Sequence, residues 1–139
     1  MTESPKIHGS CVCRAVKFAI APPFMAFQYC HCSRCRKASG SAHAANLFVP
    51  PTQLEWLGGQ EHVRRFELPE AKYWSRCFCA TCGSALPWLT RTGRAYLVPA
   101  GTLDDDPGAR PNRNIYWASR ASWYLHSSEL ECFDDGPPT

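Results

Sequence analysis

The sequence predicts a single all-β domain spanning residues 1–139. Apolar and polar residues alternate over short segments, as they do in half-buried strands. Prolines, glycines and an aspartate-rich turn separate these segments, and no stretch keeps a long helical period. The length suits one domain, and 45% hydrophobic with 19% charged residues is typical of a soluble globular protein.

The first strand is expected to run from Ile7 to Ile20 and to end at the two prolines that follow Ala21. Its apolar residues from Val12 onward share one parity, whereas Cys11 and Cys13 share the other. One face of this strand would therefore pack on the core, and the other would present two thiols. Further strands are expected at Ala45–Val49, around Leu54 and Trp56, and at Val63–Leu68, Tyr73–Cys79, Ser84–Leu89, Ala95–Ala100, Asn114–Ser119 and Ser122–Leu125.

Little helix is expected. One turn is predicted in Arg36–Ser41, with Gly40 as its stop. Residues 1–5 and 134–139 are expected to be flexible tails, because chain ends that are rich in proline and glycine seldom pack.

Three thiols lie close together in Cys30–Cys35. In extended backbone Cys30 and Cys32 point to the same side, and a tight turn can bring Cys35 back to them. Three convergent thiolates suit zinc. Because zinc takes four ligands, three protein ligands leave one position open, which is typical of a catalytic site.

A second thiol group is expected from Cys79 and Cys82, whose spacing with Gly83 behind it is that of a zinc knuckle. Cys11 and Cys13 would complete a closed Cys₄ site with structural zinc. Cys77 and Cys79 also form a Cys-x-Cys pair, so Cys77 is an alternative to Cys82 as the second ligand. The glycine that follows Cys82 favours the knuckle formed by Cys79 and Cys82. The remaining thiols, Cys77 and Cys132, are expected to be buried as small apolar side chains.

The nine cysteines are expected to be metal ligands or free thiols rather than a disulfide framework. Their odd number fits poorly with complete pairing. Residues 1–5 lack the basic and apolar regions of a signal peptide, which favours a reducing cytoplasm. No apolar run approaches the roughly 20 residues that span a bilayer, so no membrane association is expected.

These motifs together resemble the glutathione-dependent formaldehyde-activating enzyme (GFA, or CENP-V/GFA) family. The resemblance rests on Gly9–Cys13, Cys30–Ser41 and Phe78–Ser84. It implies a compact, mostly antiparallel β fold of the Mss4-like type with two zinc sites, the occupancy of the second being left open. The implied ligands are Cys11, Cys13, Cys79 and Cys82 for structural zinc, and Cys30, Cys32 and Cys35 for catalytic zinc.

Two positions depart from the family pattern. Arg14 stands where the family usually has glycine after its first Cys-x-Cys. Asn114 stands before Ile115, where members often have histidine, so a candidate proton carrier is missing.

The resemblance implies a zinc-dependent carbon–sulfur lyase or synthase that acts on the thiol adduct of a small aldehyde. In the family, glutathione adds to formaldehyde to give S-hydroxymethylglutathione. Two alternatives are a non-catalytic zinc-binding interaction module and a redox switch through Cys32 and Cys35. The formal charge of +3 would be offset by zinc-bound thiolates, and the basic residues are scattered, so a nucleic-acid partner is not expected. The oligomeric state is not predicted.

Several residues near the three thiols are candidates for substrate contacts. Arg34, Arg36 and Lys37 are placed to bind a carboxylate of a peptide-like thiol, or else form a solvated basic face. His31 is expected to point away from the thiols, and His43 is the better candidate for a proton carrier. The tryptophans are expected in the core rather than as a substrate platform: Trp74, Trp88, Trp117 and Trp123.

Overall fold

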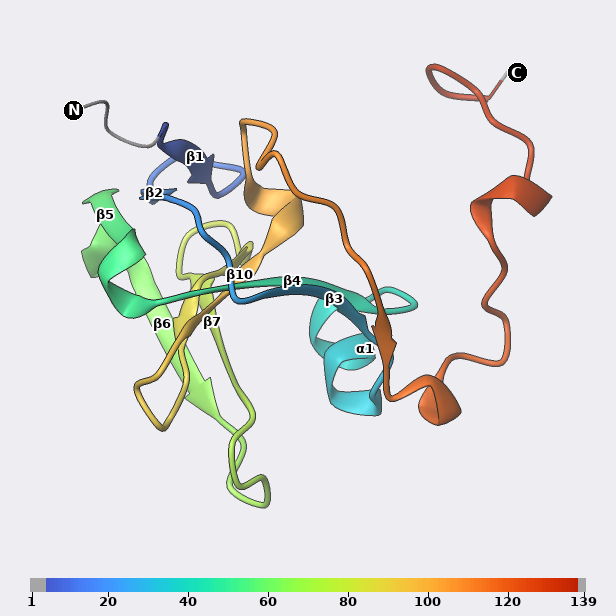
Figure 1. The fold of residues 1–139 in the computed structure, drawn as a ribbon, viewed down its shortest axis with the longest axis horizontal. Coiled ribbons are helices and arrows are strands. Elements are labelled where there is room, and N and C mark those ends of the chain that lie inside the picture. Colours follow the sequence, from blue (N-terminus) through green and yellow to red (C-terminus); the bar gives the residue numbers. More distant parts are fainter. Residues whose placement is uncertain (1–4, 138–139) are drawn as a thin grey trace.

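Eleven short strands form three sheets in the computed structural model, which describes residues 5–137 (Figure 1). The strands are β1 (Ile7–Ser10), β2 (Lys17–Ile20), β3 (Ala26–Cys30), β4 (Ala44–Val49), β5 (Leu54–Gly58), β6 (Val63–Glu67), β7 (Ser75–Cys79), β8 (Ala85–Leu86), β9 (Trp88–Leu89), β10 (Tyr96–Pro99) and β11 (Asn114–Ile115). The helices are α1 (Ser33–Ser39) and 3₁₀ turns at Pro51–Gln53, Gln60–His62, Ala100–Thr102, Trp117–Ser119 and Ser127–Glu129. The predicted all-β class with few helical turns is confirmed.

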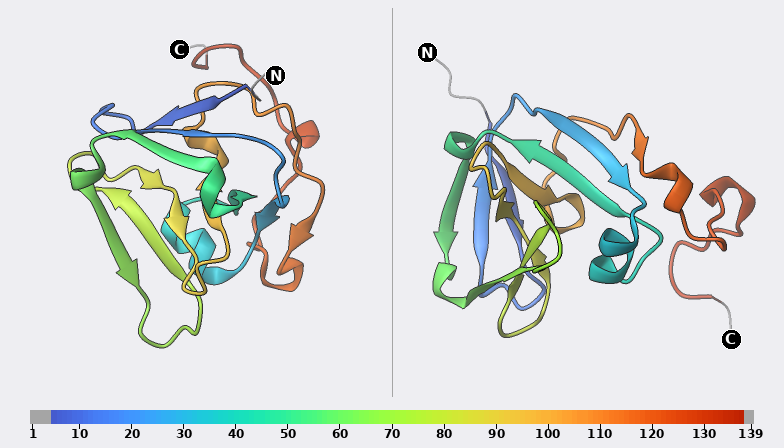
Figure 2. Two further views of the ribbon diagram at one scale, coloured as in Figure 1. Left: turned by 60° about the vertical axis from the view of Figure 1, so that its left-hand side comes forward. Right: turned by 90° about the horizontal axis from the view of Figure 1, so that it is seen from below.

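The largest sheet has the strand order β11-β3-β4-β10-β9, and two smaller sheets have the orders β1-β2-β5 and β6-β7-β8. All named strand pairs are antiparallel except that of β11 with β3, which is parallel. β3 and β4 run side by side through the middle of the molecule, with α1 beneath the end of β3 (Figures 1 and 2). Since β3 ends at Cys30, the helix that follows begins beside this thiol.

The core lies where the three sheets meet. Phe18 and Ile20 from β2, Leu47 from β4 and Leu86 from β8 have at most 1% of their surface exposed. Alternation along each strand places these side chains on the inner face. Ile7 of β1 and Cys79 of β7 belong to this core and Phe27 of β3 packs against it, so the core fixes the three strands from which the thiol groups extend.

The segment Ile7–Ile20 is a hairpin and not the single strand that the alternation predicts. β1 ends at Ser10, and the chain turns before β2 begins at Lys17. Arg14 donates its backbone N–H to the Cys11 carbonyl at 2.9 Å and has a left-handed φ of 65°. Glycine adopts this conformation without steric cost, which explains the family's preference for it there. Val12, expected in the core, is at the turn with 87% of its surface exposed.

Other boundaries also differ from the prediction. α1 begins at Ser33, earlier than expected, and ends at Gly40, whose φ of 62° confirms the predicted stop. Pro87 divides Ser84–Leu89 into β8 and β9, because proline cannot donate to a ladder. Of the two late strands, only Asn114–Ile115 forms within the described part of the chain.

After β11 the chain leaves the sheets and runs along one side of the molecule (Figure 1). Cys132 is exposed there, so its predicted burial is wrong, whereas Cys77 is buried as expected. Trp117 and Trp123 are 38% and 65% exposed and do not belong to the core. Of the predicted tails, 1–4 and 138–139 lie outside the described residues.

Candidate metal centres and the adjoining cleft

The first candidate metal centre consists of Cys11, Cys13, Cys79 and Cys82, called the quartet here. Their sulfur atoms all lie within 4.8 Å of one another. Cys11 and Cys13 come from the turn after β1, whereas Cys79 ends β7 and Cys82 lies in the turn that follows. Gly83 supports this second turn with a left-handed φ of 77°. Residues more than sixty positions apart therefore form one group of thiols.

The quartet favours the thiolate form at its knuckle. Hydrogen bonding with the Ser84 hydroxyl, at 3.2 Å from Cys82 Sγ, is the largest cause that lowers the pKa of Cys82 to about 5. The pKa of Cys79 is also lowered, mainly by the backbone N–H of Cys82. Hydrogen bonding with Cys11 and burial raise the pKa of Cys13, so the thiolate form is favoured at the knuckle only. Four sulfur atoms this close together still form a donor set that fits Zn²⁺.

The second candidate centre, called the trio here, consists of Cys30, Cys32 and Cys35, whose sulfur atoms likewise lie within 4.8 Å of one another. Cys30 ends β3, Cys32 is the N-cap of α1, and Cys35 lies in the first helical turn. Cys32 Sγ accepts the backbone N–H of Cys35 at 3.3 Å. The first turn of the helix is therefore the tight turn that the spacing of the three cysteines predicts.

Within the trio, the thiolate form is favoured at Cys30 and disfavoured at Cys35. Hydrogen bonding from Cys35 is the largest cause that lowers the pKa of Cys30 to about 6, against the effect of burial. The same bond, with burial, raises the pKa of Cys35. One sulfur is held as a thiolate by a proton on its neighbour. A soft cation can take the place of that proton, so the trio also fits Zn²⁺.

A cleft of about 1060 Å³ adjoins the trio, and all three of its cysteines line the wall. The opposite side is formed by β7, β8, β9 and the segment 72–74 that precedes β7. The quartet is not part of this lining. The two thiol groups thus differ in their surroundings, because only the trio faces a space where a ligand can bind.

The predicted basic residues separate in the structure. Arg34 lines the cleft, whereas Arg36 and Lys37, on the same helix, are not among the lining residues. The Arg34 side chain is exposed and has no hydrogen-bond or ion-pair partner within residues 5–137. Four further basic residues line the cleft, and no motif near the trio could have indicated them: Lys72, Arg76, Arg91 and Arg94.

A cluster of aromatic rings lies behind the trio. His31 is fully buried, and its Nε2 lies 2.9 Å from Asn114 Oδ1. His43 lines the cleft and stacks on Tyr29 with ring centroids 4.1 Å apart. Burial lowers the pKa of His43. Tyr124, from the segment after β11, packs edge-on against His31 at 5.4 Å. His31 thus lies outside the group of three sulfurs, in a ring cluster that no local sequence pattern indicates.

Comparison with known proteins agrees with this arrangement. The model of the family "glutathione-dependent formaldehyde-activating enzyme" (GFA) matches residues 6–119. This chain belongs to the GFA family. A Halomonas elongata protein provisionally named as a glutathione-dependent formaldehyde-activating enzyme is 33% identical over 141 residues, which cover 94% of this chain and 88% of that protein.

The fold has a solved counterpart as well. The crystal structure of a Rhodobacter sphaeroides protein superimposes with a TM-score of 0.60 at 23% identity, covering 77% of this chain and 97% of the other. This similarity shows the fold alone. No helix within the described residues is long and apolar enough to cross a membrane.

Proposed function

We propose that this GFA-family protein is a zinc-dependent carbon–sulfur lyase or synthase that acts on the adduct of a thiol, such as glutathione, with a small aldehyde. The observation that carries the proposal is the position of the trio in the wall of the cleft. A three-sulfur group that faces a binding space suits chemistry, whereas the quartet suits a structural ion.

The proposed metal assignments follow the two groups. Cys30, Cys32 and Cys35 would hold the catalytic ion, and the quartet would hold the structural one. When bound by these three cysteines, zinc would supply a positive charge that stabilises a thiolate at neutral pH. The family membership and the all-sulfur donor sets both support zinc as the metal.

Arg34 is proposed to bind the thiol substrate, and His43 is proposed to accept the proton of its thiol group. Arg34 offers an unpaired guanidinium to a substrate carboxylate at the edge of the cleft. His43, with its lowered pKa, is neutral near physiological pH and donates from Nδ1 to the Ala44 carbonyl at 3.2 Å. Its Nε2 is then free to accept the proton that the thiol releases.

The reaction balances without an oxidant or reductant. The thiolate sulfur attacks the aldehyde carbon, a C–S bond forms, and the C=O π bond breaks. The carbonyl oxygen takes up the proton that the thiol gave up, and the product is an S-hydroxyalkyl thioether. The lyase direction reverses each of these changes.

The first prediction tests this proposal by NMR exchange between free formaldehyde, glutathione and their adduct. We expect the purified protein to accelerate exchange above the spontaneous rate. In Cys32→Ala, which lacks a ligand of the trio, the protein-catalysed part of the exchange rate should be lower by about 100-fold or more. Cys132→Ser is the matched control and should retain full activity, since this exposed thiol is outside both groups.

Absence of acceleration in the zinc-loaded wild type would contradict the proposal. It would favour the non-catalytic zinc-binding interaction module. Equal activity of Cys32→Ala and wild type would contradict the role of the trio.

A further inference from the structure

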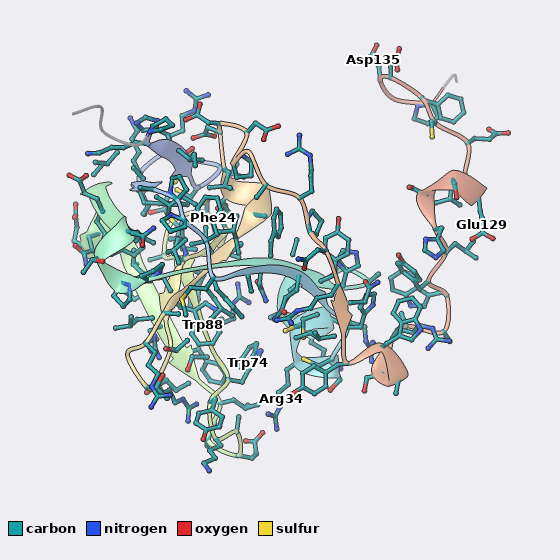
Figure 3. All side chains as sticks on the ribbon, in the orientation of Figure 1. Phe24, Arg34, Trp74, Trp88, Glu129 and Asp135 are labelled. Atoms are coloured by element: carbon teal, nitrogen blue, oxygen red, sulfur yellow. The ribbon has the colours of Figure 1, made fainter. Side chains whose placement is uncertain are left out.

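The lining of the cleft contains apolar and aromatic side chains beside the basic ones. Trp74 and Trp88, called the aromatic wall here, lie on the side opposite the trio, and Phe48 of β4 and Leu97 of β10 also line the cleft. Each of the four is only half-buried by the rest of the protein. Figure 3 shows Trp88, Trp74 and Arg34 following one another along the space between the β6–β7 hairpin and α1. Concave apolar surface left uncovered beside reactive groups is typical of a site for an apolar ligand group.

The backbone at Trp74 is held by Arg91 before any ligand binds. Arg91 donates to the carbonyl oxygens of Trp74, at 2.8 Å, and of Ala71, at 2.9 Å, and its Nε lies 3.1 Å from Ser75 Oγ. Its side chain is 25% exposed and also pairs with Glu67 at 3.1 Å. These contacts hold the segment before β7 against the cleft. Arg91 is therefore a positioning residue for the aromatic wall.

Trp88 is held in a similar way. It belongs to β9, whose register with β10 pairs it with Leu97. Arg65 lies over its ring with the guanidinium carbon 5.9 Å from the centroid. A rigid aromatic surface costs little conformational entropy when a ligand binds, so it favours a planar group over a flexible one.

The size of the cleft exceeds what formaldehyde requires. A volume of about 1060 Å³ is just above the roughly 300–1000 Å³ typical of sites for drug-sized ligands. Formaldehyde has one carbon and no group that could contact Trp74 or Trp88. The carboxylates of a glutathione-like thiol suit the cationic side chains of Arg34 and Arg94, which line the cleft. Such a thiol contains no aromatic ring that could stack on the two tryptophans.

We propose that the aldehyde-derived part of the substrate carries an apolar planar group, such as an aryl ring, which lies on Trp74 and Trp88 while the sulfur is at the trio. This proposal rests on the proposed thiol–aldehyde chemistry and narrows its substrate class. The covalent change is the same: one C–S bond forms, the C=O π bond breaks, and the thiol proton ends on the oxygen.

Binding of unreactive thioethers tests this proposal without chemistry. S-benzylglutathione and S-methylglutathione carry the same peptide and differ in the ring, and quenching of tryptophan fluorescence or calorimetry measures each Kd on the zinc-loaded protein. We expect the benzyl compound to bind about tenfold more tightly to the wild type, since aromatic contacts and buried area both favour it. Trp74→Ala should reduce this ratio to about two.

Trp123→Ala is the matched control, because this tryptophan is exposed on the segment after β11 and does not line the cleft. It should keep the tenfold ratio. Trp74→Phe retains a ring and should keep most of the preference, which separates loss of the aromatic wall from misfolding.

Equal affinities of the two thioethers for the wild type would overturn this inference even if formaldehyde exchange is accelerated. An unchanged ratio in folded Trp74→Ala would also overturn it. A preference for the benzyl compound in a protein that accelerates no exchange would leave the aromatic wall supported and the proposed function contradicted.

Discussion

At the scale of single residues, Asn114 supports a buried histidine beside the trio. Its Oδ1 lies 2.9 Å from Nε2 of His31, whose Nδ1 has no hydrogen-bond partner among the described residues. A carbonyl oxygen can only accept, so Nε2 carries the proton and Nδ1 is the acceptor nitrogen. The residue that departs from the family pattern thus has a structural partner in this chain.

Asn114→Ala removes the partner of His31 and leaves both ring nitrogens unsatisfied. Because an unpaired buried polar group costs about 1 to 3 kcal/mol, we expect the free energy of unfolding in urea to fall by this amount. Asn112→Ala is the control, since its side chain is exposed and its backbone N–H bond to Phe27 is retained. Equal stability of the Asn114→Ala variant and wild type would contradict the assigned contact.

The spacing of the cysteines identifies the residues that the chemistry requires and misses those that only the fold brings near. Cys-x-Cys and Cys-x-x-Cys constrain sulfur positions over a few residues, so the trio and each pair of the quartet are predictable from local spacing, whereas the joining of the two pairs is what the family resemblance implies. Trp74 precedes β7 of another sheet and Arg91 lies in the loop between β9 and β10, both far from the trio in sequence, so no local pattern encodes their approach to the cleft. The burial expected for Cys132 is wrong because a lone cysteine carries no information on its surroundings.

At the scale of elements, the turns decide where the functional groups lie. Arg14 turns the first hairpin and brings Cys11 and Cys13 to the knuckle. Gly40 ends α1 after the trio, and this stop is predictable because glycine favours the left-handed conformation. The hairpin formed by β1 and β2 is not predictable in this way, because the apolar alternation continues through its turn. Val12 has the parity of the core residues although it is exposed.

Gly59 connects β5 to the next 3₁₀ turn and packs closely on the first hairpin. Its φ is 76°, and a Cβ atom there would collide with the backbone oxygen of Ala15. We expect Gly59→Ala to lower the free energy of unfolding by about 2 kcal/mol or more, because left-handed strain and backbone displacement add. Denaturant unfolding measures this change.

The adjacent Gly58 is the matched control for this prediction. It lies in β5 with an ordinary φ and open space at its Cβ position, so Gly58→Ala should cost little. Similar losses from the two alanine variants would contradict the close contact at Gly59.

At the scale of the whole molecule, the two thiol groups lie in different surroundings. The quartet joins the first hairpin to the β7–β8 turn across more than sixty residues of sequence, and the trio faces the cleft. The all-β class follows from alternation and turn residues. The three-sheet topology and the exposed course of the chain after β11 do not, because strand order depends on long-range packing that no local pattern records.

The proposed function depends most on two separate metal-binding groups, and the zinc content of the protein tests this directly. We expect wild-type protein purified without chelator to hold two equivalents of zinc by elemental analysis, and folded Cys35→Ser to hold one. Cys77→Ser, which alters a buried thiol outside both groups, should still hold two. Two equivalents in Cys35→Ser, or one in the wild type with no change on mutation, would contradict the division of the seven thiols into a quartet and a trio.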